Sequence, residues 1–215
     1  MKPTRLFFPA ALALVAFALW TAAVCTVDVQ PIGPGGSTVG LATLNRSFHT
    51  FTGVHLWLYV ATDWLSLLPV GMALAFALLG LAQWIRRRSL ARVDRSLLVL
   101  GGFYLAVMAA YALFEMLVIN RRPVLLDGVL EASYPSSTTL LVLCVSATAI
   151  LQLRGRIRRP GLRRCLCGLL AGYAALMVLA RLLCGVHWLS DVVGGVLLSA
   201  ALILTYRACI RLTTP

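Results

Sequence analysis

Three ionisable residues lie near the end of the chain in a stretch that is otherwise almost entirely apolar: Arg181, His187 and Asp191. Ionisable groups at membrane depth are costly unless they have a partner or a function. His187 and Asp191 are four positions apart, so on a helix they would share a face, and the carboxylate could accept a proton from the imidazole. An oriented imidazole beside a guanidinium supplies the nucleophile and the anion clamp that attack on a phosphorus centre requires.

A second polar segment reads Tyr134-Pro135-Ser136-Ser137-Thr138-Thr139. A proline followed by hydroxyl residues predicts a helix start, where backbone N–H groups lack partners and the helix dipole attracts anions. An ordinary helix cap explains the same residues. The phosphate-binding interpretation is favoured because Arg122 and Arg181 are expected on the same side of the membrane as this helix start.

The composition indicates an integral membrane protein. The chain has 215 residues, 60% of them apolar, and a mean hydropathy of +0.91, which is far outside the range of soluble globular proteins. The length suits a single all-α membrane domain over residues 1–215. The net charge of +12 does not indicate nucleic-acid binding, because the arginines flank apolar spans.

Six apolar runs are predicted to cross the membrane as helices, since each approaches the ~20 residues that a ~30 Å hydrocarbon core requires. The first run follows Lys2 and Arg5, as in a signal peptide, but it is longer than a typical signal-peptide apolar region, so we expect an uncleaved first span. The predicted spans are 6–27, 58–84, 97–119, 136–153, 165–184 and 190–210.

Basic residues are distributed unevenly between the two ends of these spans. Of the 19 lysines and arginines, all but Arg46, Arg121, Arg122 and Arg181 fall on the side that carries both termini. The positive-inside rule makes that side cytoplasmic, with both termini inside. The exceptions lie on the outer side, where positive charge is otherwise avoided, so they invite a functional explanation.

The outer segment 28–57 has two open interpretations. Apolar and aromatic residues recur among polar ones over 48–57, which fits an amphipathic helix lying on the outer leaflet, and a plain connector fits equally well. His49 and His55 are interpreted as surface or interfacial histidines. The cysteines fall within or at the ends of the spans, and Cys165-Leu166-Cys167 lacks the spacing and histidine partners of a zinc site.

The spacing of the polar residues resembles the type 2 phosphatidic acid phosphatase family, whose fold is shared with the vanadium haloperoxidases. The family pattern is Lys-x6-Arg-Pro, then Pro-Ser-Gly-His, then Ser-Arg-x5-His-x3-Asp. The resemblance covers residues 115–191 by motif and the six-span layout by topology. A haloperoxidase is disfavoured because the chain is almost entirely membrane-embedded. The matching positions are Arg122-Pro123, Pro135-Ser136 and, at the full spacing, Arg181, His187 and Asp191.

This resemblance implies a membrane phosphatase that acts on a lipid phosphate. His187 would be the nucleophile and form a phosphohistidine that water hydrolyses, while Asp191 would orient and polarise it. No metal or other cofactor would be needed, because arginines and a helix start supply positive potential. The active site would face the extracytoplasmic side of a bacterial plasma membrane. The residues implied in phosphate binding are Arg122, Ser136, Ser137, Thr138 and Arg181.

Two departures from the family pattern affect the expected chemistry. The lysine of the first motif falls on Glu115, two helical turns before Arg122, and we expect Glu115 to pair with Arg121 or Arg122 as a supporting contact. The histidine of the second motif, understood to protonate the leaving oxygen, falls on Thr138. Losing a general acid typically costs ~10²–10⁴ in rate.

The missing histidine leaves the substrate and the function open. A phosphate leaving from a lipid diphosphate is a better leaving group than an alkoxide, since its second pKa is about 6. This favours a prenyl diphosphate, such as the undecaprenyl carrier recycled outside bacterial membranes. Phosphatidic acid or phosphatidylglycerophosphate is the alternative, with water, His49 or His55 as the acid. The rival function is a protein that binds or transports lipid phosphates without turnover, against which the intact His187–Asp191 pair argues.

Overall fold

The structure is a computed structural model that describes residues 3–213. Over this range the secondary structure is helical apart from isolated β-bridges, which confirms the predicted all-α fold. The bounds are α1 Pro3–Thr26, η1 Pro34–Gly36, α2 Ala42–Thr52, α3 Leu56–Leu65, α4 Leu67–Arg87, η2 Leu90–Arg92, α5 Arg95–Leu117, α6 Ser137–Arg156, α7 Pro160–Leu183 and α8 Leu189–Thr213.

Six helical segments of the described chain are long and apolar enough to cross a membrane, which confirms the predicted number and order of spans. Many large apolar side chains on them are exposed, as expected where the surroundings are hydrocarbon and not water. The segments are Arg5–Thr26, Leu56–Arg87, Arg95–Leu117, Ser137–Arg156, Pro160–Leu183 and Leu189–Thr213.

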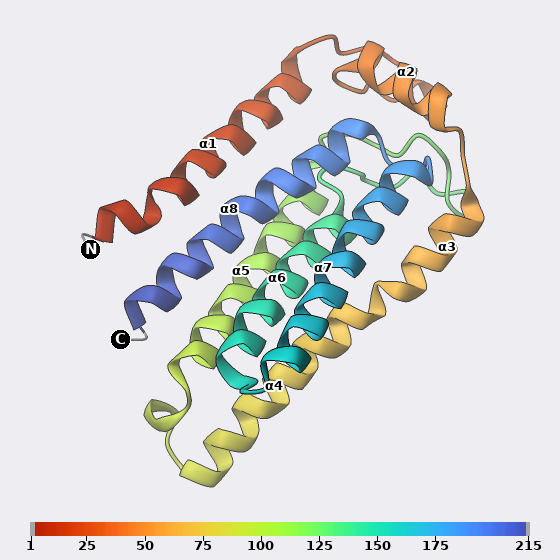
Figure 1. The fold of residues 1–215 in the computed structure, drawn as a ribbon. Helices are drawn as coiled ribbons and strands as arrows, with labels where there is room; N and C mark the ends of the chain where they lie inside the picture. The colour runs from red at the N-terminus through yellow and green to blue at the C-terminus, as the bar shows by residue number, and fades with distance from the viewer. Residues whose placement is uncertain (1–2, 214–215) are drawn as a thin grey trace.

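The second span is longer than predicted and is broken into α3 and α4 at Ser66. Pro69 lacks a backbone N–H and cannot bond to the carbonyl of Leu65, so the helical ladder is interrupted there. The hydroxyl of Tyr173 on α7 donates to that carbonyl at 2.9 Å instead. The break leaves α3 as a short separate helix that contacts α7 near the end of the bundle (Figure 1).

The core of the bundle forms around α8, which contacts α1, α5, α6 and α7 (Figure 1). Buried polar groups inside it are hydrogen-bonded between helices, as lipid surroundings require. Gln152 of α6 donates to the hydroxyl of Tyr206 at 2.8 Å and to the carbonyl of Ser96 at 3.0 Å. The largest apolar cluster includes Phe17, Leu100, Phe103, Tyr134, Leu140 and Leu198.

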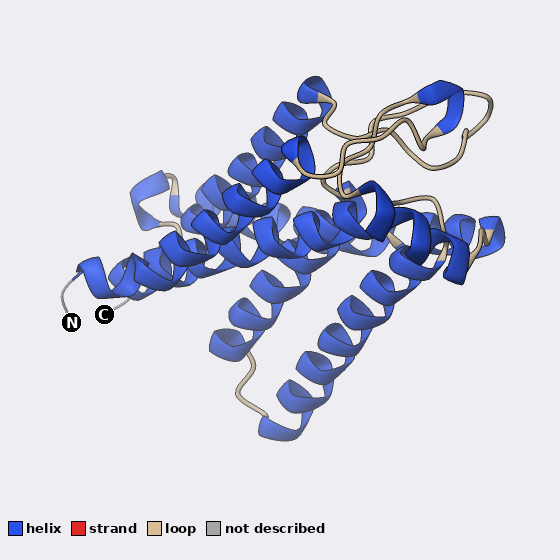
Figure 2. Ribbon diagram, turned by 90° about the horizontal axis from the view of Figure 1, so that it is seen from above, coloured by secondary structure: helices blue, strands red, loops and turns tan. Residues whose placement is uncertain are grey.

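The long connecting segments gather at the end of the bundle opposite the chain termini (Figure 2). Helices α5 and α7 end there, and helices α6 and α8 begin there (Figure 1). The arginine-rich connectors after α4 and α6 lie at the other end, with both termini (Figure 1). The helices therefore bring the polar segments of the sequence together and keep the basic connectors away from them.

The segment 28–57 is neither a plain connector nor a free helix. It contains α2, which packs against α8, and its Phe51 and Trp57 are 87% and 71% exposed. These exposed aromatic side chains agree with the amphipathic interpretation. Contact of this segment with the outer leaflet stays a prediction.

Candidate active site

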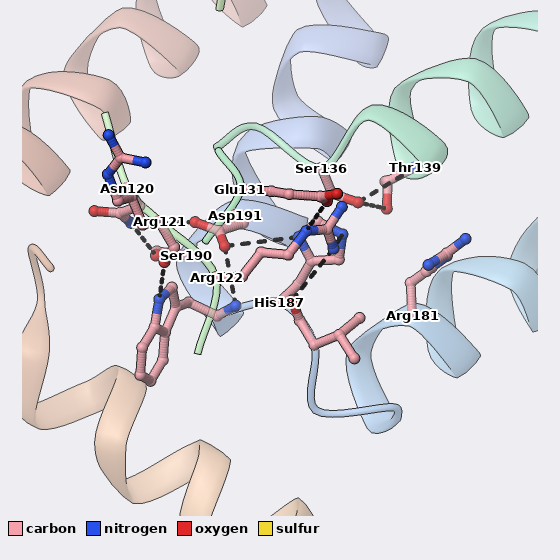
Figure 3. Close-up of polar contacts among 12 residues, drawn as sticks. Asn120, Arg121, Arg122, Glu131, Ser136, Thr139, Arg181, His187, Ser190 and Asp191 are labelled. Atoms are coloured by element: carbon pink, nitrogen blue, oxygen red, sulfur yellow. Dashed lines mark hydrogen bonds and ion pairs between the residues drawn. The ribbon is translucent and has the colours of Figure 1, made fainter. Parts of the chain in front are cut away.

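The polar segments singled out in the sequence meet at one end of the bundle (Figure 3). Arg122 comes from the loop after α5, Ser136 precedes α6, and His187 and Asp191 come from the junction of α7 and α8. A cavity of about 180 Å³ is lined by both Arg122 and His187. Its other polar lining residues are Tyr111, Glu115, Glu131, Ser133, Tyr134 and Ser137.

The prediction that His187 and Asp191 share a helix face is wrong, because α8 begins at Leu189 and His187 lies in the preceding loop. The helix begins there because Asp191, in its first turn, accepts a hydrogen bond at 3.0 Å from the backbone N–H of Trp188. The two side chains nevertheless meet, with His187 Nδ1 at 3.7 Å from Asp191 Oδ2. A helix cap, and not helical periodicity, therefore sets the geometry of this pair.

Gly185 allows the chain to turn between α7 and His187. Its φ is +71°, and a Cβ atom there would lie 2.1 Å from the carbonyl oxygen of Gly53. Only glycine tolerates both the left-handed conformation and this close approach. One residue earlier, the carbonyl of Cys184 accepts a hydrogen bond at 2.9 Å from the backbone N–H of His55. The segment before α3 therefore anchors the loop that carries His187.

The position of the proton on His187 follows from its contact with Arg122. Arg122 Nη1 lies 3.1 Å from His187 Nε2, and a guanidinium can only donate hydrogen bonds. Nε2 is therefore the acceptor, so a neutral ring carries its proton on Nδ1, facing Asp191. Burial lowers the pKa of His187 below its ordinary value of 6.5, and the Asp191 carboxylate opposes this shift. A neutral ring with its lone pair on Nε2 is the nucleophilic form.

A buried network that the sequence did not reveal holds Asp191 in place (Figure 3). Asn120 donates to Asp191 Oδ1 at 3.1 Å. Asn45 of α2 donates to the hydroxyl of Ser190 at 2.9 Å, and its carbonyl accepts from the backbone N–H of Ser190 at 3.0 Å. All four side chains are buried. Asn120 adjoins a motif and could have been suspected, whereas no spacing rule links Asn45 to a residue so far along the chain.

Glu115 does not pair with Arg121 or Arg122, because α5 ends before either arginine and helical spacing no longer applies. The partner of Arg122 is Glu131, whose Oε2 lies 2.9 Å from Arg122 Nε. A bridge between Arg121 and Ala132 folds the loop back on itself and brings Glu131 beside Arg122. Glu115 lines the same cavity with its side chain exposed.

Arg121 has a structural role in this loop. Its Nη1 donates to the carbonyl of Leu130 at 2.9 Å, and its own carbonyl accepts a hydrogen bond at 2.7 Å from Trp188 Nε1. The second bond ties the loop after α5 to the residue that follows His187. Arg121 therefore supports the site through its backbone, as an anchor between two segments.

Ser136 is the N-cap of α6, which agrees with the interpretation of this segment as an ordinary helix cap. Its Oγ accepts from the backbone N–H of Thr139 at 3.4 Å and from the Thr139 hydroxyl at 3.0 Å (Figure 3). The side chain is fully buried, and the backbone N–H of Ser136 donates to the carbonyl of Asp191 at 2.9 Å. Ser137 lines the cavity, whereas Thr138 lines a neighbouring groove.

Arg181 lies apart from the Arg122–His187 pair (Figure 3) and does not line the cavity. Its side chain is 1% exposed, and its Nη2 forms an ion pair at 3.2 Å with Asp63 of α3. The ring of Tyr59, one turn earlier on α3, lies 4.9 Å from the Arg181 Cζ and 6.0 Å from the Arg122 Cζ. The short helix α3 therefore contacts both arginines, a role that the sequence did not indicate.

Neither histidine of the segment 28–57 lines the cavity. His49 Nε2 lies 3.0 Å from the carbonyl of Gly185, and its ring lies 5.4 Å from that of Trp188. His55 Nε2 lies 3.0 Å from the carbonyl of Thr52. A carbonyl can only accept, so both Nε2 atoms donate to the backbone, and neither histidine is placed to act as the general acid.

Residues 118–214 match the PAP2 superfamily. A comparison with curated proteins gave no match. Among solved structures, the chain is similar to the crystal structure of a transmembrane PAP2-type phosphatidylglycerolphosphate phosphatase from Bacillus subtilis. The two chains are 17% identical, with a TM-score of 0.59 over 93% of this chain and 94% of that chain, which shows a common fold. The matched residues contain Arg122, Ser136, His187 and Asp191, so the part of the chain that carries the candidate site is the part that is similar to the PAP2 superfamily.

Proposed function

We propose that this protein is an integral membrane phosphatase of lipid phosphates, with His187 as the nucleophile. The observation that carries the proposal is the contact of His187 with Arg122 at 3.1 Å in a cavity, with Asp191 at 3.7 Å from the other ring nitrogen. The superfamily and the fold support phosphatase activity. A protein that only binds lipid phosphates gains nothing from an imidazole whose proton is oriented in this way.

In the proposed reaction, the lone pair on His187 Nε2 attacks the terminal phosphorus, and the bond from that phosphorus to the oxygen of the leaving group breaks with its electrons on that oxygen. Asp191 stabilises the positive charge that the ring acquires. A water molecule then attacks the phosphohistidine, the nitrogen–phosphorus bond breaks, and neutral His187 is restored. In the net reaction water supplies the oxygen of the released phosphate and the proton of the leaving group, which is a lipid phosphate when the substrate is a diphosphate and a lipid hydroxyl when it is a monophosphate.

Arg122 and Ser137 are the proposed phosphate ligands, because both line the cavity. Arg122 uses Nε and Nη1 for Glu131, His187 and the carbonyl of Val186, which leaves the N–H groups of Nη2 for a phosphoryl oxygen. Its Nη1 must move from His187 to the phosphate before attack. The backbone N–H groups in the first turn of α6 add a helix-dipole contribution.

The remaining residues expected to bind phosphate have weaker support. Arg181 acts on the site through its charge, while its hydrogen bond goes to Asp63. Ser136 contributes by capping α6, and Thr138 faces the neighbouring groove. Asn120 joins the set as a positioning residue for Asp191.

A lipid diphosphate is the proposed substrate class. Thr138 cannot protonate a leaving group, and His49 and His55 are engaged by backbone carbonyls. A leaving phosphate needs little protonation, since its second pKa is about 6, whereas an alkoxide needs a strong general acid. The wild-type kcat/KM should therefore be at least ~10²-fold higher for a prenyl diphosphate than for a long-chain alkyl monophosphate. A preference for the monophosphate would contradict this assignment.

The proposed location of the site is the extracytoplasmic face of a bacterial plasma membrane. The cavity lies at the end of the bundle opposite the arginine-rich connectors and the termini (Figure 1). By the positive-inside rule those connectors are cytoplasmic. A substrate exposed at the outer leaflet could then reach the cavity without crossing the bilayer.

The proposed function is tested by phosphate release from lipid mono- and diphosphates by the purified protein in detergent. His187→Ala should abolish release, whereas His55→Ala should retain it, since the His55 ring bonds the carbonyl of Thr52 and does not line the cavity. A phosphoryl group trapped on His187 by a quench that avoids acid would support the intermediate directly. Binding of lipid diphosphate without any release in the wild type would favour the rival binding protein.

A further inference from the structure

A second, apolar cavity adjoins the candidate active site. It has a volume of about 200 Å³ and lies between α5 and α6, where it is lined by residues of both helices. It shares Tyr111, Ser137 and Leu140 with the cavity that contains Arg122 and His187. The two cavities are therefore contiguous across the start of α6.

The groove runs from the phosphate cavity toward the membrane interior. Along α5 its lining descends from Tyr111 to Val107, and along α6 from Ser137 to Leu141. Each step is one helical turn, about 5–6 Å. Both segments belong to membrane spans, and Met108 and Tyr111 on its rim are 57% and 41% exposed. The groove therefore opens sideways to the hydrocarbon of the bilayer.

We propose that this groove holds the first carbons of the hydrocarbon chain of the substrate, with Thr138 at its head as a residue that recognises the chain. The proposal rests on the proposed function, which places the phosphate beside His187. The leaving group, which carries the lipid chain, lies opposite the nucleophile in a phosphate ester and in a diphosphate alike, so the chain must leave the cavity away from His187. Among the residues described, Thr138 lines the groove and does not line the phosphate cavity.

The side chain at position 138 then sets the width of the groove. Threonine is short, and its methyl group suits an apolar channel while its hydroxyl can donate a hydrogen bond to an oxygen of the leaving group. A larger side chain would occupy the space of the lipid chain. Threonine in place of the histidine of the family pattern thus affects which lipid chains fit the groove as well as how the leaving group is protonated.

Another apolar cavity, separate from the groove, serves as an internal control. It has a volume of about 310 Å³, lies between α4 and α5, and shares no lining residue with the phosphate cavity. Leu98 lines this cavity and is 44% exposed, while Met108 lines the groove and is 57% exposed. Both residues lie on α5, so a tryptophan at either position makes a matched pair.

The test compares kcat/KM for hexadecyl phosphate with that for butyl phosphate, and likewise for long- and short-chain prenyl diphosphates. Met108→Trp and Thr138→Trp should lower the long-to-short ratio by about tenfold or more, since a misfit of one methylene in an apolar pocket already changes kcat/KM by about 10–200-fold. Leu98→Trp should leave the ratio within about twofold. Equal ratios in all variants, or an equal effect of Leu98→Trp, would overturn the proposal.

Photo-crosslinking separates this proposal from the proposed function. A lipid phosphate with a diazirine near its first carbons should label peptides that contain residues 107–111 and 137–141, and Met108→Trp should reduce that labelling. The same lipid without its phosphate should not label them above the level of the general lipid-facing surface. Labelling without any phosphate release would support chain binding in the groove and contradict the proposed phosphatase activity. Phosphate release with labelling elsewhere would contradict chain binding in the groove.

Discussion

At the scale of single residues, the contacts of His187 determine both its tautomer and its charge. Arg122 donates to Nε2, and Asp191 faces Nδ1, so the ring is oriented before substrate arrives. Burial lowers the pKa of His187, and of the nearby groups the Asp191 carboxylate acts in the opposite direction. Arg122 and Asp191 thus decide which nitrogen attacks, while burial, opposed by Asp191, sets the direction in which the pKa of His187 is shifted.

The first prediction concerns the pH dependence of kcat/KM. Since the folded pKa of His187 lies below 6.5, the ring should stay neutral as the pH falls through 6.5, and activity should decline only at lower pH. Asp191→Asn removes the group that raises this pKa, so the acid limb should move to still lower pH while kcat falls by ~10²-fold or more. Asp127→Asn, in the exposed loop after α5, is the control. A wild-type acid limb above 6.5 would contradict the assignment of His187.

At the scale of secondary-structure elements, short helices and their ends position the site. The first turn of α8 presents Asp191, α2 supports that turn through Asn45, and α3 contacts both arginines through Tyr59 and Asp63. These elements hold polar groups where the spans end. Single changes at their junctions should therefore affect the site as well as the fold.

The second prediction concerns Gly185, at the turn between α7 and α8. An alanine there requires a left-handed conformation and places Cβ against the Gly53 carbonyl, so Gly185→Ala should destabilise the fold by about 1–3 kcal/mol and displace His187. Thermal unfolding in detergent and phosphate release measure the two effects. Gly101→Ala, where a Cβ has open space, is the control. Equal melting temperatures for the two variants would show that the turn is not constrained as described.

The third prediction concerns the ion pair between Asp63 and Arg181. Asp63 is 63% exposed, but the guanidinium that it pairs with is only 1% exposed, and Asp63→Asn removes the negative charge beside it, so the loss of stability should exceed the ~1 kcal/mol of a pair in which both side chains are exposed. Arg87→Gln breaks a pair whose side chains are 45% and 35% exposed and serves as the comparison. We expect a lower melting temperature and a raised KM for Asp63→Asn only. If Arg87→Gln were the more damaging change, α3 would not hold Arg181 in the way proposed.

At the scale of the whole molecule, the bundle has one basic end and one end that contains the candidate site. The basic end carries the termini and the connectors after α4 and α6, and the other carries the loops that converge on His187 (Figure 1). Because connectors rich in lysine and arginine are usually cytoplasmic, this asymmetry sets the expected orientation of the protein in the membrane.

The fourth prediction tests that orientation in intact cells. In a background in which the exposed Cys25 and Cys165 are replaced by serine, Val129→Cys should react with an impermeant thiol reagent, whereas Leu90→Cys should not. Both native side chains are well exposed, at 58% and 55%, so accessibility differs only by the side of the membrane. After the cells are broken, both cysteines should react. The opposite labelling in intact cells would invert the topology.

The sequence by itself determined the membrane class, the number and order of the spans, and the grouping of Arg122, Ser136 and His187 at one end. Hydropathy and charge placement are local properties, and six spans in alternation leave few ways to arrange their ends. The break of the second span was less visible, because a proline in the first turn of a helix is ordinarily tolerated. Its effect depends on Tyr173, which takes the freed carbonyl.

Only the tertiary structure decided which groups pair within the site. Helical spacing predicted Glu115 as the partner of Arg121 or Arg122 and a shared helix face for His187 and Asp191, but a helix end separates the members of each pair. Beyond a helix end the chain direction is set by long-range contacts, which have no period in the sequence. Glu131 on a folded-back loop, Asp63 on a broken span and Asn45 on α2 reach the site through such contacts.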